Sequence, residues 1–154
     1  MRSNLPNGLA NKYLKLDVPV DYDFAVVGII CGFRNYRLCH EMNKCLGVEM
    51  ERSDDIIIPA GHKGSHTLHA CYKGYLEEDH GYFLVSNKDM KGTGFLIPEQ
   101  RTFDYFLIID PACPQGDLNK CISRIRDIDI VTGAFESDPT EYRSAEAFLI
   151  VLDT

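Results

Sequence analysis

Three histidines that lie close together in the sequence, His62, His66 and His69, have side chains that could bind a metal ion. On a helix, intervals of four and three residues would put all three on one face, ready for zinc or iron. Proline and glycine precede or interrupt this run, however, and residues 67–72 have the pattern of a strand, on which His66 and His69 point to opposite faces. The sequence therefore favours a solvated loop followed by a strand, and we predict no metal ion or other cofactor.

Residues that could act as nucleophiles are also poorly placed for catalysis. The sequence contains no Gly-x-Ser-x-Gly elbow, phosphate-binding loop or dinucleotide fingerprint. Cys39 and His40 are adjacent, but neighbouring residues on a helix point in different directions. The six cysteines contain no Cys-x-x-Cys spacing, and several occupy apolar positions of predicted elements, which is typical of buried thiols. We therefore expect reduced cysteines with a structural role.

Two carboxylates that could share acid–base work, Glu99 and Asp104, lie in the stretch IPEQRTFDY at residues 97–105, here called the signature stretch. Pro98 removes one backbone donor and keeps the residue before it extended, so Glu99 is expected at a break before a strand. Alternation along residues 103–109 puts Asp104 on a face with apolar side chains, where a half-buried carboxylate needs partners.

Two interpretations of the signature stretch remain open. In the first, Arg37 or Arg101 pairs with Asp104, and together with Glu99 and Tyr105 they form a polar binding site at the edge of a sheet. In the second, which we favour, a buried ion pair and a turn fix how the strand enters the sheet. We assign these five residues to binding and name no catalytic residue.

Aromatic residues gather on one predicted hairpin, where Tyr72, Tyr75, Tyr82 and Phe83 lie close together. Tyrosines on a sheet face can fill a protein interface, although ordinary cross-strand packing explains the same pattern. Because basic residues are not interleaved with these aromatic ones, a protein partner fits better than RNA.

The elements that must position these side chains alternate between strands and helices. Residues 24–31 and 103–109 are strongly apolar, which predicts central strands covered on both faces. Apolar stripes predict helices over Asn35–Leu46, capped by Asn35 and stopped by Gly47, and over residues 117–126. Further strands are predicted over residues 13–18, 66–76, 81–86 and 128–135, and one or two short strands within residues 48–58. A short helix is predicted after Asp138. Residues 148–152 are predicted to form either a last strand or a packed tail.

This order of elements predicts an α+β fold. We expect two β-α-β units with an intervening β-hairpin, arranged as a ferredoxin-like split sandwich of a mainly antiparallel sheet with two helices. Residues 1–11 are predicted to be a flexible N-terminal tail and residues 12–154 a single domain. A chain of 154 residues, 45% of them hydrophobic, is long enough to bury its own core.

Charge and hydropathy narrow the class of partner. With 16 basic and 23 acidic residues, the net charge of −7 disfavours nucleic acid, and the chain has no polybasic segment that would hold it at a membrane. The N-terminal residues lack the unbroken apolar region of a secretory signal, and the longest apolar stretch, residues 24–31, is too short to span a bilayer. We therefore expect a cytoplasmic protein that binds neither nucleic acid nor membranes.

The string IPE, three residues and then FDY resembles the signature of the IPExxxVDY family, small bacterial proteins named for that motif. Phe103 stands where the signature has valine, a conservative change on a buried strand. The resemblance covers roughly residues 13–138, including the string YRLC at residues 36–39. It implies a small cytoplasmic protein without an assigned reaction, cofactor or catalytic residue.

Two hypotheses about function follow. The first, which we favour, is a non-enzymatic binding or regulatory module that uses a sheet face or edge to bind a protein partner or a second copy of itself. The second is a small enzyme or ligand-binding domain in which Arg37, Glu99, Asp104 and Tyr105 converge on one open cleft. Convergence of these four side chains in the structure would support the second hypothesis, and their separation or burial would oppose it.

Overall fold

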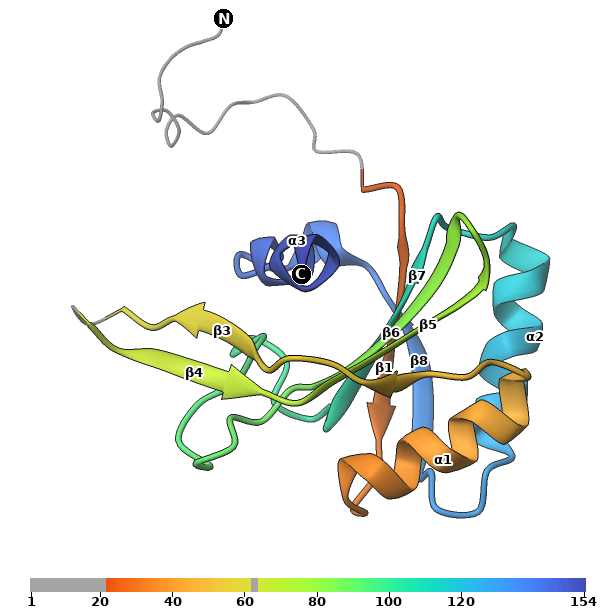
Figure 1. Ribbon diagram of the computed structural model, residues 1–154, viewed down its shortest axis with the longest axis horizontal. Helices are drawn as coiled ribbons and strands as arrows, with labels where there is room; N and C mark the ends of the chain where they lie inside the picture. Colours follow the sequence, from red (N-terminus) through yellow and green to blue (C-terminus); the bar gives the residue numbers. More distant parts are fainter. Residues whose placement is uncertain (1–21, 62–63) are drawn as a thin grey trace, which may run out of the picture.

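A six-stranded sheet forms the centre of the structure, a computed structural model that describes residues 22–61 and 64–154 (Figure 1). The strands are β1 (Ala25–Ile30), β2 (Glu51–Arg52), β5 (Cys71–Glu77), β6 (His80–Ser86), β7 (Tyr105–Asp110) and β8 (Gly133–Ser137), in the spatial order β2-β5-β6-β7-β1-β8. Each neighbouring pair runs antiparallel, so the prediction of an α+β fold with a mainly antiparallel sheet is confirmed. The predicted tail and the strand over residues 13–18 lie outside the described residues.

Helices cover both faces of this sheet: α1 (Asn35–Leu46), α2 (Gln115–Arg126) and α3 (Glu146–Asp153), with a 3-10 turn η1 (Pro139–Glu141) before α3. Figure 1 shows α1 and α2 on one side of the sheet and α3 on the other. Alternation along β1 supports both layers, because Val27 packs with the α1 and α2 residues and Val26 with Phe148 of α3. The prediction of two helices therefore missed α3. None of the helices in the described part of the chain has the length and apolar character needed to cross a membrane.

The ends of the helices test the predicted capping residues. Gly47 stops α1 with a left-handed φ of 70°, and its N–H donates to the Asn43 carbonyl. Asp138 caps η1 as predicted, because its side chain accepts a hydrogen bond from the Thr140 N–H at 3.0 Å. The predicted cap of α1 is wrong, since the N-cap position falls one residue before Asn35 and has no side-chain hydrogen bond.

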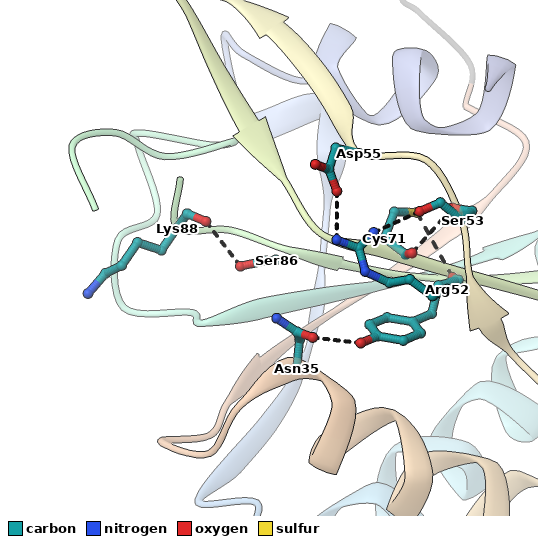
Figure 2. A network of polar contacts seen from close by, with 8 residues as sticks. Asn35, Arg52, Ser53, Asp55, Cys71, Ser86 and Lys88 are labelled. Atoms are coloured by element: carbon teal, nitrogen blue, oxygen red, sulfur yellow. Dashed lines mark hydrogen bonds and ion pairs between the residues drawn. The ribbon is translucent and has the colours of Figure 1, made fainter. Parts of the chain in front are cut away.

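Asn35 belongs instead to a set of polar contacts around β2 and β5 (Figure 2). Its side-chain oxygen accepts a hydrogen bond from the Tyr72 hydroxyl at 2.6 Å, which joins the start of α1 to β5. On β5, the Cys71 carbonyl accepts a hydrogen bond from the Ser53 N–H at 2.9 Å. The chain therefore follows the edge of β5 as far as Ser53 and then turns away from the sheet.

The segment that turns away forms a two-stranded ribbon of β3 (Ile56–Pro59) and β4 (His66–His69). In Figure 1 the ribbon projects from the sheet on the same side as α3. The single strand predicted over residues 66–76 is consequently two strands, because β4 pairs with β3 whereas β5 pairs with β6. The predicted hairpin of β5 and β6 and the short strands within residues 48–58 are confirmed.

The C-terminal part contains the largest departures from the predicted elements. The strand predicted over residues 128–135 begins only at Gly133, because the preceding residues turn, with the Val131 N–H donating to the Ile128 carbonyl. The run FLIVL, predicted as a strand or packed tail, lies within α3, where Phe148 and Val151 face the core. A uniformly apolar run has no period by which a helix can be distinguished from a strand.

Candidate functional site

The signature stretch is a loop folded around one buried asparagine. Asn87 directly follows β6 and is 0% exposed. Its side-chain oxygen accepts a hydrogen bond from the Ile97 N–H at 2.9 Å, and its side-chain nitrogen donates to the carbonyls of Gln100 and Phe103 at 2.9 and 2.8 Å. Its backbone N–H donates to the Asp104 carbonyl at 2.9 Å. One side chain thus satisfies three backbone groups and fixes the shape of the loop.

Asp104 and Tyr105 hold the connection between β1 and α1. The Asp104 carboxylate accepts a hydrogen bond from the Cys31 N–H at 2.8 Å, and the Tyr105 hydroxyl donates to the Phe33 carbonyl at 2.6 Å. Burial raises the pKa of the Tyr105 phenol, and neighbouring Cys31 and Asp104 raise it further, so the hydroxyl remains a donor. Asp104 therefore holds a backbone group 73 residues earlier in the chain, and Tyr105 holds one 72 residues earlier.

Glu99 has a different partner, at the start of α3. Its carboxylate accepts a hydrogen bond from the Ser144 N–H at 2.8 Å, just before α3 begins. Partial burial opposes ionisation of Glu99, but hydrogen bonds from Ser144 and nearby backbone outweigh it and keep the pKa of Glu99 below its ordinary value. Glu99 is therefore ionised at neutral pH and connects the signature stretch to α3.

The two arginines predicted to pair with Asp104 lie over aromatic rings instead. The guanidinium carbon of Arg37 is 5.5 Å from the centroid of the Phe33 ring, and that of Arg101 is 5.2 Å from the Phe95 ring. Within residues 22–61 and 64–154, no ion pair joins either arginine to a carboxylate of the signature stretch. The predicted site residues therefore do not meet at one place. The loop before α1 is contacted by Arg37, Asp104 and Tyr105. Arg101 contacts Phe95, and Glu99 contacts the start of α3.

A groove of about 680 Å³, here called the ribbon groove, lies between the ribbon, the signature stretch and α3. Its apolar lining includes Ile58 from β3, Phe95 from the loop and Ile150 from α3, and Arg143 and Glu146 add charged groups. The full lining comprises residues 58–61, 65–67 and 93–96 with Pro98, Arg143, Ser144, Glu146, Ala147 and Ile150. A shallower hollow of about 310 Å³ continues from it past Pro98 to Glu99. The volume lies in the range of ligand pockets, and the lining combines apolar side chains with polar and charged ones.

The outer edges of the two ribbon strands differ. Leu68 on β4 lies opposite Ile57 on β3; its N–H donates to the Asp89 carboxylate at 2.8 Å, and its carbonyl accepts from the Met90 N–H at 2.9 Å. Because backbone groups alternate in direction along an antiparallel pair, the N–H and C=O of Ile57 also point away from the ribbon. No strand of the described chain pairs with that edge, and Pro59, the next outward residue, has no N–H. The unpaired edge belongs to β3, the ribbon strand that contacts α3.

The two described histidines of the candidate metal site point apart. His66 is exposed and His69 is buried, in agreement with the predicted alternation along β4. The ring nitrogens of His69 lie 2.9 Å from the Ser86 carbonyl and 2.8 Å from the Thr67 hydroxyl. Burial lowers the pKa of His69 despite these hydrogen bonds, which favours the neutral ring. His62 lies outside the described residues, and within them no group of three His, Cys, Asp or Glu side chains is placed to hold a metal.

The aromatic side chains of the hairpin do not form one exposed face. Tyr72 and Phe83 are 8% and 4% exposed, whereas Tyr75 is 60% exposed. The ring of Tyr75 meets the edge of the Phe83 ring at a centroid distance of 6.0 Å. Cross-strand packing therefore accounts for most of this cluster.

Sequence reasoning missed both Asn87 and the ribbon groove. An asparagine directly after an apolar strand is an ordinary loop residue by pattern, so nothing marks it as buried. The groove is built from three separate segments, none of which has an unusual composition. Comparisons with protein-family models, curated proteins and solved structures gave no match. The IPExxxVDY assignment therefore stays a prediction.

Proposed function

We propose that this protein is a non-enzymatic binding module that takes an extended peptide segment of a protein partner into the ribbon groove. The observation that carries the proposal is the unpaired edge of β3 beside an apolar groove. A peptide strand added to this edge would hydrogen-bond to the N–H and C=O of Ile57. Every second side chain of the peptide would then enter the groove, because side chains alternate along a strand.

The lining of the groove defines the chemistry of the peptide. Ile58, Phe95 and Ile150 favour apolar side chains at alternate positions, and Arg143 and Glu146 suit polar neighbours at the rim. Pro59 limits the length of pairing, because it offers a carbonyl but no N–H to a partner strand. The partner segment is accordingly short and has alternating apolar and polar residues.

A small enzyme or ligand-binding domain has less support. Glu99 accepts a hydrogen bond from the Ser144 N–H, and Asp104 accepts one from the Cys31 N–H. The two carboxylates are therefore bound to backbone of different segments, whereas shared acid–base work requires both near one reacting group.

Selection of random-sequence peptides on the full chain tests the proposal, with affinities measured by fluorescence polarisation. Ile58→Glu puts a charge in the groove, and Leu76→Glu is its matched control, because the Leu76 side chain is 48% exposed on β5 and does not line the groove. Ile58→Glu is expected to weaken selected peptides at least about tenfold, equivalent to about 1.4 kcal/mol, and Leu76→Glu to leave them unchanged.

A second matched pair, Ile150→Glu in the groove and Leu149→Glu at an exposed position of α3, guards against loss of folding in one variant. Circular dichroism checks that each variant is folded. The proposal is overturned if no peptide is selected, or if selected peptides bind folded Ile58→Glu and Ile150→Glu as tightly as the unsubstituted chain.

Three finer assignments belong with this proposal. The split β-α-β arrangement of a ferredoxin-like sandwich is supported by β7 and β8, which α2 joins and which both run antiparallel to β1 between them. Membership of the IPExxxVDY family rests on the signature stretch. A cytoplasmic location fits the six free cysteines, since a reducing compartment keeps thiols unpaired. If the partner is a second copy of this chain, sedimentation velocity of the purified protein will detect a dimer.

A further inference from the structure

We infer that the hollow beside Glu99 is a subsite for a basic side chain, lysine or arginine, of the peptide segment that occupies the ribbon groove. The inference rests on the proposed function, because it names one residue of the partner peptide. The hollow and the groove adjoin each other, since Pro98, Arg143 and Ser144 line both. A peptide strand in the groove can therefore extend one side chain past Pro98 to Glu99.

Glu99 presents a negative charge that is held in place but has no cation beside it. Its carboxylate accepts the hydrogen bond from the Ser144 N–H at 2.8 Å, and the residue is exposed. Within residues 22–61 and 64–154, Glu99 forms no ion pair, and neither does Arg143 or Glu146. A carboxylate has two oxygens and about four lone-pair sites. Glu99 can therefore accept hydrogen bonds from a cation while it keeps its bond to Ser144.

The charges that line the groove and the hollow favour a basic partner residue. Two carboxylates, Glu99 and Glu146, and one guanidinium, that of Arg143, leave a net charge of −1 when histidine is counted as neutral. The chain as a whole carries −7, so its field attracts basic peptides and repels acidic ones. Arg143 opposes this preference, but its guanidinium ends a long, exposed side chain that can turn away from an incoming cation.

The shape of the hollow suits a long side chain with a charged end. The hollow has a volume of about 310 Å³, and Pro98 supplies apolar surface beside Glu99. Lysine and arginine have apolar stems that lie along such surface while their charged ends stay in water. The stem would pack on Pro98 and the charged end would reach Glu99. Because both charges remain exposed, the pair contributes more to specificity than to affinity.

The residues found in peptides selected from a random-sequence library on the full chain reveal the charge preference. At one end of the alternating apolar residues, we expect lysine and arginine to exceed aspartate and glutamate by at least about threefold. Selection on Glu99→Lys is expected to reverse this preference. Equal frequencies of basic and acidic residues on the unsubstituted chain, or an excess of acidic ones, overturn the inference.

A double-mutant cycle locates the preference at Glu99. Glu99→Gln removes the charge but keeps a side-chain oxygen that can accept from the Ser144 N–H. Replacing the basic residue of a selected peptide by glutamine should weaken binding to the unsubstituted chain about threefold and leave binding to Glu99→Gln unchanged. Arg143→Gln should strengthen binding of the basic peptide, whereas Glu141→Gln, at an exposed position outside both linings, should not alter it. Equal losses in the unsubstituted chain and in Glu99→Gln would contradict the assignment.

Nα-acetyl-arginine amide separates this inference from the proposed function, because it offers a basic side chain without a strand. Titrated into the labelled full chain, it should shift the nuclear magnetic resonance signal of the Ser144 amide in the unsubstituted chain but not in Glu99→Gln. If this shift occurs and no peptide is selected, the subsite stands and the proposed function falls. If selected peptides are sensitive to Ile58→Glu but show no charge preference, and the shift is absent, the proposed function stands and the inference falls.

Discussion

At the scale of single residues, the contacts of Asn87 predict a measurable effect on stability. Asn87→Ala removes the side-chain partner of the buried Ile97 N–H and of the carbonyls of Gln100 and Phe103, which lie in a partly buried loop. Unsatisfied buried groups cost about 1–3 kcal/mol each, partly relieved by water, so we expect a loss of about 3 kcal/mol in the free energy of unfolding. Urea denaturation measures it. Lys88→Ala, at an exposed neighbouring position, should change stability by less than about 0.5 kcal/mol. Similar values for the two variants would contradict the role assigned to Asn87.

Phe103, where the signature stretch departs from the motif that it resembles, packs against a glycine on β1. The Phe103 ring occupies the space where a side chain at Gly28 would begin. Gly28→Ala should therefore cost about 1–3 kcal/mol through overpacking. In a Phe103→Val background the same change should cost at least about 1 kcal/mol less. Urea denaturation of the four proteins in this double-mutant cycle gives the coupling energy, and additive effects would show that the two positions are independent.

At the scale of elements, the end of α1 depends on the left-handed backbone conformation of Gly47. Gly47 has a φ of 70°, which disfavours any residue with a Cβ, although no atom would obstruct that Cβ. We expect Gly47→Ala to lower the free energy of unfolding by about 1 kcal/mol. Gly32→Ala is the matched control, because Gly32 also has open space around it but no left-handed φ. Equal thermal unfolding midpoints for the two variants would count against strain at Gly47.

The elements that sequence reasoning predicted best are those with a clear period and a local stop. α1 has the predicted bounds because its apolar residues recur at helical spacing and a glycine directly follows its last residue. Both features that predict this helix are therefore local in the sequence. α3 lacked such signals, since FLIVL is apolar at every position and only the sheet beneath it selects which side chains are buried. Asp104 was correctly expected to need a partner, but that partner is a backbone N–H 73 residues away, which no local pattern encodes.

At the scale of the whole molecule, acid should destabilise the fold through His69. Its pKa is lowered by burial, so between the lowered value and the ordinary value of 6.5 the unfolded chain binds a proton that the folded chain does not. The free energy of unfolding therefore falls as the pH decreases below about 6.5, the ordinary pKa of histidine. His69→Gln should flatten this part of the profile in urea titrations, and exposed His66→Gln should keep it. An unchanged slope in His69→Gln would assign the acid sensitivity to other groups.

The ribbon groove has walls from residues 58–67, 93–98 and 143–150, and this has a consequence for how the protein is made. A ribosome releases the chain from its N-terminus, so the wall contributed by α3 emerges after the other two walls. A nascent chain that has completed β3, β4 and the signature stretch still lacks the third wall of the groove. Under the proposed function, capture of a partner requires residues 143–150 to have emerged and folded, and a product that stops before them stays inert.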